Sequence, residues 1–188
     1  MSSQFSRCRL SQTLICLLLV GLGVLQSAGA VEVGKEHQLK AAFVYNFTKF
    51  VEWPLNRFPD TNSPIVIGVV GKATITAALE SVVKDRKING RDILVKTVET
   101  LEEARVAHLL FLPASEDKRL NDFLAPLATA GVLTVGESSA FTRERGMINF
   151  VLENDKVRFD FDMEAVDRAG IKISAQLQKL AKTIRRKN

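Results

Sequence analysis

Hydrophobic and polar residues alternate between residues 146 and 164, in the stretch GMINFVLENDKVRFDFDME. Pairing Leu152 with Val157 places six apolar side chains on one face of a predicted β-hairpin, and a shift of one residue would mix the two faces. The other face is polar, with Asn149 opposite Asp160, and it meets either water or another protein. The predicted apolar face consists of Ile148, Phe150, Leu152, Val157, Phe159 and Phe161.

Continuous apolar runs separated by helical patterns fill most of the remaining chain. Apolar strands that alternate with helices are typical of a parallel sheet covered on both faces. The sequence therefore predicts a single three-layer α/β domain, with a mostly parallel sheet, helices on both faces and an antiparallel C-terminal hairpin at an edge or end of the sheet. The predicted strands before the hairpin are 65–71, 91–98, 107–113 and 131–136. The predicted helices are 39–53, 74–85, 115–128 and 175–186, with a short helix at 162–169.

The first thirty residues have the pattern of a cleavable secretory signal peptide. Arg7 and Arg9 precede an apolar run over residues 14–25, and small residues follow it up to Ala30. We expect cleavage after Ala30, which leaves residues 31–188 as one exported α/β domain without stable membrane insertion. An uncleaved anchor is the alternative, although the apolar run is short for a spanning helix.

Composition and motifs indicate a protein that is not an enzyme. The formal net charge of +5 falls to +3 without the two signal arginines, an excess too mild to indicate nucleic-acid binding. Cys8 and Cys16 both lie in the predicted signal, so the mature domain has no thiol for a disulfide, a nucleophile or a metal site. His37 and His108 lack partners at metal-binding spacing, and His108 opens an apolar strand, which indicates a structural role. No serine-nucleophile or nucleotide motif is present, so we expect no catalytic residue, metal or cofactor.

Three segments together resemble the YfiR family of small exported bacterial proteins. They are LKAAFVYNFTKFVEWP, VLTVGE and GMINFVLENDKVRFDFDMEAVDRAGIKISAQLQKLAK, and the likeness runs from Leu39 to Lys182. The resemblance implies a periplasmic regulator that binds the periplasmic sensor region of an inner-membrane diguanylate cyclase and inhibits it. Such inhibition would lower cyclic di-GMP signalling and biofilm formation. The resemblance also implies a homodimer.

The chain departs from the family pattern at a few positions. Some relatives carry cysteines that allow redox control, whereas no cysteine follows the signal here. The resemblance also implies asparagine at the position of Asp162 and glycine at the position of Arg145. These two departures bear on the choice of partner.

A regulator without catalytic residues recognises its partner through its surface. The polar face of the hairpin and the segment after it are the best candidate, with Asp160, Glu164, Arg168 and Ile171 as predicted partner-binding residues. An exposed Ile171 would anchor an interface, whereas a buried one would belong to the core.

A second function is compatible with the sequence. The carboxyl ends of the predicted strands, near Gly71, Pro113 and Gly136, can frame a crevice, as open α/β sheets commonly do. The chain would then be a periplasmic sensor that binds a small molecule in this crevice. This alternative follows from the fold class and not from a motif.

Overall fold

The computed structural model describes residues 28–186 of the 188-residue chain. The chain divides into two units after Glu36, and the sheet and both hydrophobic cores belong to the second unit, from His37 onward. The predicted signal peptide falls largely outside the described residues, so its cleavage stays a prediction. Among residues 28–186, no helix combines the length and the apolar character that crossing a membrane requires.

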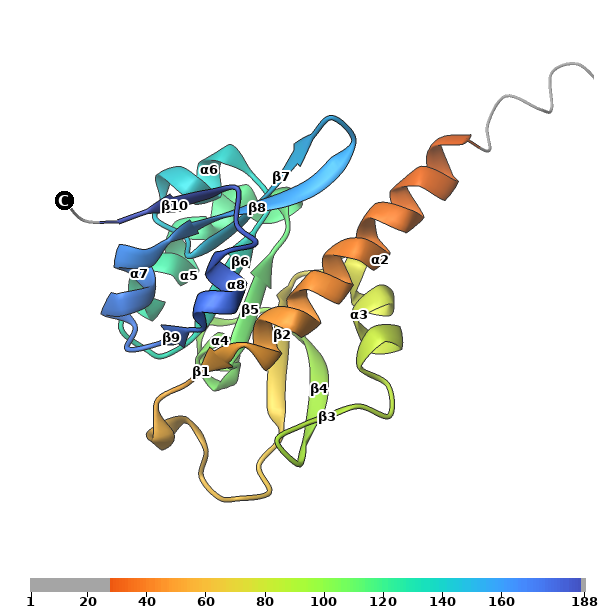
Figure 1. Cartoon of the computed structure of the whole chain (residues 1–188). Helices are drawn as coiled ribbons and strands as arrows, with labels where there is room; N and C mark the ends of the chain where they lie inside the picture. Colours follow the sequence, from red (N-terminus) through yellow and green to blue (C-terminus); the bar gives the residue numbers. More distant parts are fainter. Residues whose placement is uncertain (1–27, 187–188) are drawn as a thin grey trace, which may run out of the picture. The chain divides into compact units, whose positions relative to one another are not determined.

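An eight-stranded sheet runs through the described part of the second unit (Figure 1). Its strands are β2 (Ile65–Val70), β3 (Lys87–Ile88), β4 (Arg91–Val98), β5 (Leu109–Leu112), β6 (Leu133–Gly136), β7 (Ile148–Glu153), β8 (Lys156–Asp162) and β10 (Thr183–Arg185). They lie in the order β10-β8-β7-β6-β5-β2-β4-β3. Neighbouring strands are parallel except in the hairpins β7–β8 and β3–β4. The predicted mostly parallel sheet with an antiparallel C-terminal hairpin is confirmed, although β10 and not the hairpin forms the edge.

Helices cover both faces of this sheet. The helices that contribute to the core on the first face are α2 (Ala28–Lys49), α3 (Ile75–Val83), α7 (Met163–Arg168) and α8 (Ala175–Gln178). The helices of the second face are α4 (Leu101–Val106), α5 (Leu120–Leu127) and α6 (Ser139–Arg143). Two 3-10 helices, η1 (Leu55–Arg57) and η2 (Ala114–Arg119), complete the helical segments. This arrangement confirms the predicted α/β class.

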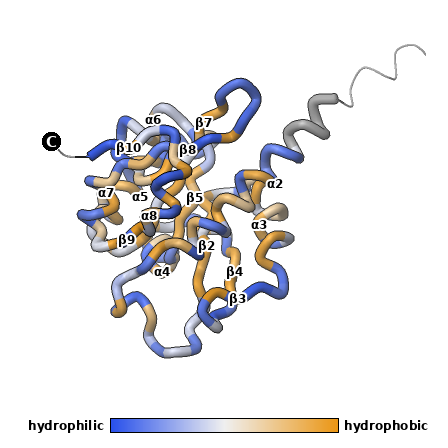
Figure 2. The backbone as a smooth tube through the Cα atoms, in the orientation of Figure 1, coloured by the Kyte–Doolittle hydropathy of each residue, from blue (hydrophilic) through white to orange (hydrophobic). Residues whose placement is uncertain are grey.

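Strand β5 shows why its apolar run forms a strand of the sheet interior. Leu109 and Phe111 belong to the core on the first face, whereas Leu110 and Leu112 belong to the core on the second. Successive residues of a strand point to opposite faces, so a strand that is apolar at every position can bury both. Figure 2 shows hydrophobic residues concentrated in the central strands and hydrophilic residues at the tip of the β7–β8 hairpin.

The β7–β8 hairpin has the predicted register. Phe150 lies opposite Phe159, and both rings pack against Phe47 of α2, with centroids 5.7 and 5.1 Å from the Phe47 ring. Five of the six residues of the predicted apolar face are buried. The expectation for Leu152 is wrong, because this side chain is 60% exposed at the outer end of the hairpin, next to the turn.

Two predicted helices end earlier than the sequence indicates. Helix α2 stops at Lys49, and the next residues form strand β1 (Val51–Glu52), which pairs with β9 (Lys172–Ile173). The final helix predicted over 175–186 is wrong beyond Gln178, since the chain end forms β10 beside β8. The free edge of β8 offers backbone hydrogen bonds to this segment, and its β-branched residues suit a strand.

Candidate functional site

The second face of β7, β8 and β10 is polar and lies beside α6. Asn149 is opposite Asp160 in the hairpin, and Arg185 of β10 is next to Asp162 of β8. A groove of about 550 Å³ separates this face from α6. The polar side chains that line the groove are Glu137, Ser138, Ser139, Thr142, Arg143, Asn149, Asp160 and Arg185.

Asp162 links the end of the hairpin to α7. Its Oδ1 accepts a hydrogen bond of 3.1 Å from the backbone N–H of Ala165 and so caps the helix. Its Oδ2 lies 3.0 Å from Nε of Arg145 and 3.5 Å from Nη1 of Arg185. Nη2 of Arg145 also donates a hydrogen bond of 2.6 Å to Oε2 of Glu164. Glu164 and Asp162 together raise the pKa of the Arg145 guanidinium.

The two positions that depart from the family pattern therefore contact each other. Arg145 has a φ of +65°, a left-handed conformation that glycine adopts most readily. A glycine there would fit the backbone but could not bind Asp162. Arginine accepts this backbone conformation while its side chain pairs with a carboxylate that is only 6% exposed.

The structure separates the four predicted partner-binding residues. Asp160 lines the groove beside α6, whereas Glu164 and Arg168, one turn apart on α7, line a surface hollow of about 720 Å³. Ile171 is 2% exposed and belongs to the core, so the expectation of an exposed anchor is wrong. The chain reverses at Gly170, with a φ of +69°, and the N–H of Ile171 bonds to the carbonyl of Val166, which turns the side chain inward.

Phe141 fixes α6 on the sheet, a role that sequence reasoning missed. Its ring is fully buried and lies against Gly136 at the end of β6 and Gly146 before β7. A Cβ atom at either glycine would overlap the ring. The glycines of VLTVGE and GMINF thus make room for one aromatic side chain, which sets the wall of the groove. Two glycines ten residues apart, Gly136 and Gly146, are too weak a sequence pattern to predict this contact.

Substitution of Gly146 tests this packing. We expect Gly146→Ala to lower the free energy of unfolding by about 1–3 kcal/mol, because the added methyl group displaces a fully buried ring. Thermal melting of the purified protein measures the loss. Gly34→Ala is the control, since a Cβ there meets no atom of the described residues within 4 Å. Equal melting temperatures of the two variants would contradict the packing role.

A crevice is present at the carboxyl ends of the central strands, where the small-molecule alternative requires one. It measures about 320 Å³, and its polar lining includes Lys72, Thr74, Ser115 and Glu137. Glu137 is already engaged, since its Oε2 lies 2.7 Å from Nζ of Lys40 and its Oε1 accepts the N–H of Ala114. The crevice is therefore polar, with one partly neutralised acid.

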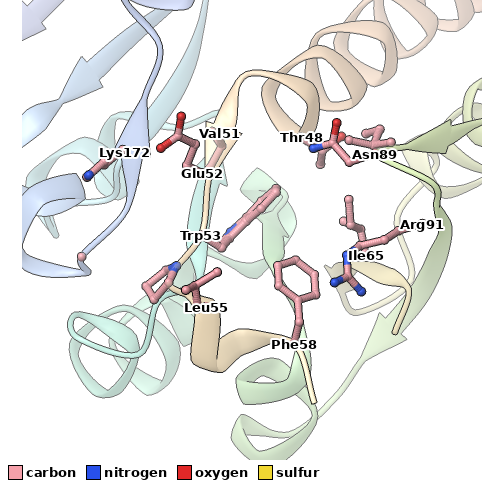
Figure 3. Close-up of a pocket in the computed structure, with 13 residues that line it drawn as sticks. Thr48, Val51, Glu52, Trp53, Leu55, Phe58, Ile65, Asn89, Arg91 and Lys172 are labelled. Carbon is pink, nitrogen blue, oxygen red and sulfur yellow. The ribbon is translucent and has the colours of Figure 1, made fainter. Parts of the chain in front are cut away.

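A larger cavity, of about 470 Å³, lies at the opposite, amino end of the strands (Figure 3). Trp53 and Phe58 line it, and the guanidinium of Arg91 lies 4.1 Å from the centroid of the Phe58 ring. Arg91 Nη1 donates to the carbonyls of Asp60 and Ser63, so this cation holds the loop before β2. The Trp53-Pro54 pair ends the first family segment, and Gly170 and Lys172 of the third family segment also line this cavity.

His108 is a buried residue behind this cavity. Its Nδ1 accepts a hydrogen bond of 3.1 Å from the N–H of Val66, and its ring stacks on Phe58 at 4.5 Å. Burial lowers the pKa of His108 to about 4, with the nearby charge of Arg57 as a second cause. The imidazole is therefore neutral at pH 7, in agreement with the predicted structural role. Across residues 28–186, no three acidic, histidine or cysteine side chains come together in a way that holds a metal ion.

Comparisons with known proteins give a family and a fold. A model of the YfiR/HmsC-like family matches residues 37–182. No curated protein matches the chain significantly. A solved structure of a conserved domain protein from Vibrio cholerae O1 biovar El Tor strain N16961 has a TM-score of 0.55 at 8% identity. The alignment covers 79% of this chain but only 60% of that chain, and it shows the fold alone.

A second solved structure is less similar. It is the ABC domain in complex with L-Trp from Streptococcus pneumoniae, with a TM-score of 0.45 and 9% identity. The alignment covers 64% of this chain and 55% of that one.

Proposed function

Because the chain belongs to the YfiR/HmsC-like family, we propose that it is a periplasmic regulatory protein that inhibits a membrane-bound diguanylate cyclase. It acts without catalysis, by binding the periplasmic sensor region of the cyclase. Inhibition lowers cyclic di-GMP and biofilm formation. The observation that carries the proposal is the family match over residues 37–182, nearly the whole of the second unit.

The charged surface of α7 and of the neighbouring strands supports docking. Glu164 is half-buried beside Arg145, which holds its carboxylate in place, and Arg168 is exposed on the next turn of the helix. Both line the same hollow, so a partner can contact an acid and a base together. We propose Glu164, Arg168 and Asp160 as docking residues. The buried Ile171 belongs to the same hydrophobic core as the buried residues of α7.

Charge reversal on α7 tests this surface. We expect Glu164→Lys and Arg168→Glu to change the free energy of unfolding by less than about 1 kcal/mol, because partly exposed ion pairs contribute little. Both variants should nevertheless weaken inhibition, since a few residues dominate an interface. Melting curves and cellular cyclic di-GMP are the two measurements. Glu80→Lys on α3, which packs near β4 at the other end of the sheet, is the control. Full inhibition by both α7 variants would place docking elsewhere.

Deletion of the gene tests the function itself. The deletion strain should contain more cyclic di-GMP than the wild type, and the full-length gene should restore the lower level. The purified protein should also bind the isolated sensor region of the cyclase, without any added ligand. Unchanged cyclic di-GMP after deletion would contradict the proposal. Size measurement of the same preparation tests the homodimer that the resemblance implies.

A sensor that binds a small molecule is the second candidate, favoured by the crevice at the carboxyl ends of the strands. A ligand that binds only the native state raises the apparent melting temperature. We expect a stabilising compound from a small-molecule library to lose its effect in Lys72→Ala, which removes a cation from the crevice lining. Stabilisation that persists in this variant would place the ligand elsewhere, for example in the cavity of Figure 3.

A further inference from the structure

Two buried acceptor oxygens in the groove beside α6 have no hydrogen-bond donor. They are Oδ1 of Asn149 and Oδ1 of Asp160, which lie directly opposite each other on β7 and β8. Asn149 is only 7% exposed, yet both residues line the groove. A buried acceptor that has lost its water without gaining a donor is costly, and native proteins contain few of them. Two of them on paired residues that line one groove indicate that a donor from outside completes the site.

Several of the cations near these oxygens already have other partners, and no cation in the described part of the chain donates to either oxygen. The groove thus combines a carboxylate with a neighbouring amide oxygen, both of which only accept at these atoms. The existing contacts are Arg143 Nη1 to Ser139 Oγ at 3.3 Å, Arg185 Nη1 to Asp162 Oδ2 at 3.5 Å, and Lys182 Nζ to Glu153 Oε1 at 2.8 Å.

We infer that the groove receives a basic side chain of the partner protein, which donates N–H groups to Asn149 Oδ1 and Asp160 Oδ1. Charge favours this occupant, because a carboxylate oxygen without a donor attracts a cation. Geometry favours arginine, since its guanidinium carries several donors in a plane and can serve two acceptors at once. The inference rests on the proposed function and specifies the chemistry by which the partner is held.

Two substitutions separate partner recognition from a structural role. Asp160→Asn keeps the size and an acceptor but removes the charge, and Asn149→Leu removes the other acceptor. If a partner satisfies these oxygens, neither variant loses an internal hydrogen bond, so melting temperatures should stay equal or rise. Removing one member of a buried, charge-assisted hydrogen bond should weaken partner binding about 30-fold or more. Glu153→Gln, an acid of the same hairpin outside the groove lining, is the control for charge.

Each variant is expressed from the full-length gene in the deletion strain, and cyclic di-GMP is measured beside the melting temperature. We expect both groove variants to stay folded and to leave cyclic di-GMP near the deletion level, while Glu153→Gln restores repression. The test requires a strain in which deletion itself raises cyclic di-GMP. If Asp160→Asn and Asn149→Leu then repress fully, the inferred role of the groove is wrong, whereas the proposed function still holds. A deletion without effect overturns both. A fall of several degrees in both melting temperatures also overturns the inference, because the oxygens are then satisfied within the folded protein or by bound water.

Discussion

Replacing Phe159 by alanine is expected to lower the free energy of unfolding by about 3–5 kcal/mol. The ring is 1% exposed and lies at the centre of an aromatic cluster, 5.4 Å from the centroid of Phe43 and 5.1 Å from that of Phe47. Its removal takes apolar surface out of the core and leaves a cavity that the rigid hairpin and helix α2 close only in part. The loss is a large fraction of the total stability of an ordinary domain.

Denaturant unfolding of the purified variant measures this loss. Leu152→Ala is a matched control, because Leu152 belongs to the same face of the same hairpin but is 60% exposed. We expect the control to change the free energy of unfolding by less than about 0.5 kcal/mol. Similar losses in the two variants would show that the hairpin is not docked on α2 as described.

Acidification from pH 7 to pH 5 is expected to lower the free energy of unfolding by about 2 kcal/mol through His108 alone. In the unfolded chain this histidine takes up a proton near its ordinary pKa of about 6.5. In the folded protein, burial lowers the pKa to about 4, so the neutral form persists. The lowered pKa means that the stability is present above pH 6.5 and is lost as the pH falls toward 4.

The contribution of His108 is isolated by substitution. His108→Asn retains a side-chain acceptor for the Val66 N–H but cannot titrate, so its stability should depend less on pH between 7 and 5. His37→Gln is the control, because it removes the other histidine of the chain, which is half-buried beside Thr74 and far from the Val66 N–H in the sequence. If His108→Asn keeps the full pH dependence of the wild type, another group causes it.

Local patterns predicted the parts of the fold that local physics determines. Alternation over a short span fixed the hairpin register, since only one register separates the apolar from the polar side chains. Local chemistry also accounts for two helix starts: Ser138 and Ser174 each accept a hydrogen bond from the first turn of the helix that follows. The crevice at the carboxyl ends of the strands follows from the topology of the sheet.

Features that depend on distant residues were beyond such reasoning. Strand β10 reads as helix in isolation, and it becomes a strand because β8 offers an open edge. Ile171 follows a glycine in a segment without periodicity, so its burial depends on where the Gly170 turn directs the chain. The unpaired oxygens of Asn149 and Asp160 were equally hidden, because the polar pattern does not distinguish a solvated face from one that lacks donors.

The order of β8 and β10 along the chain has a consequence for biosynthesis. Ribosomes make proteins from the N-terminus, so β8 is complete before Thr183–Arg185 has emerged. Until Thr183–Arg185 has emerged, the backbone groups along the outer edge of β8 lack their neighbour, and Arg185 cannot yet reach Asp162. Unpaired strand edges promote association between chains. A nonsense product that stops before Thr183 keeps this edge open permanently, and it is expected to aggregate although it retains every buried residue of both hydrophobic cores and loses only the partly buried Ile184.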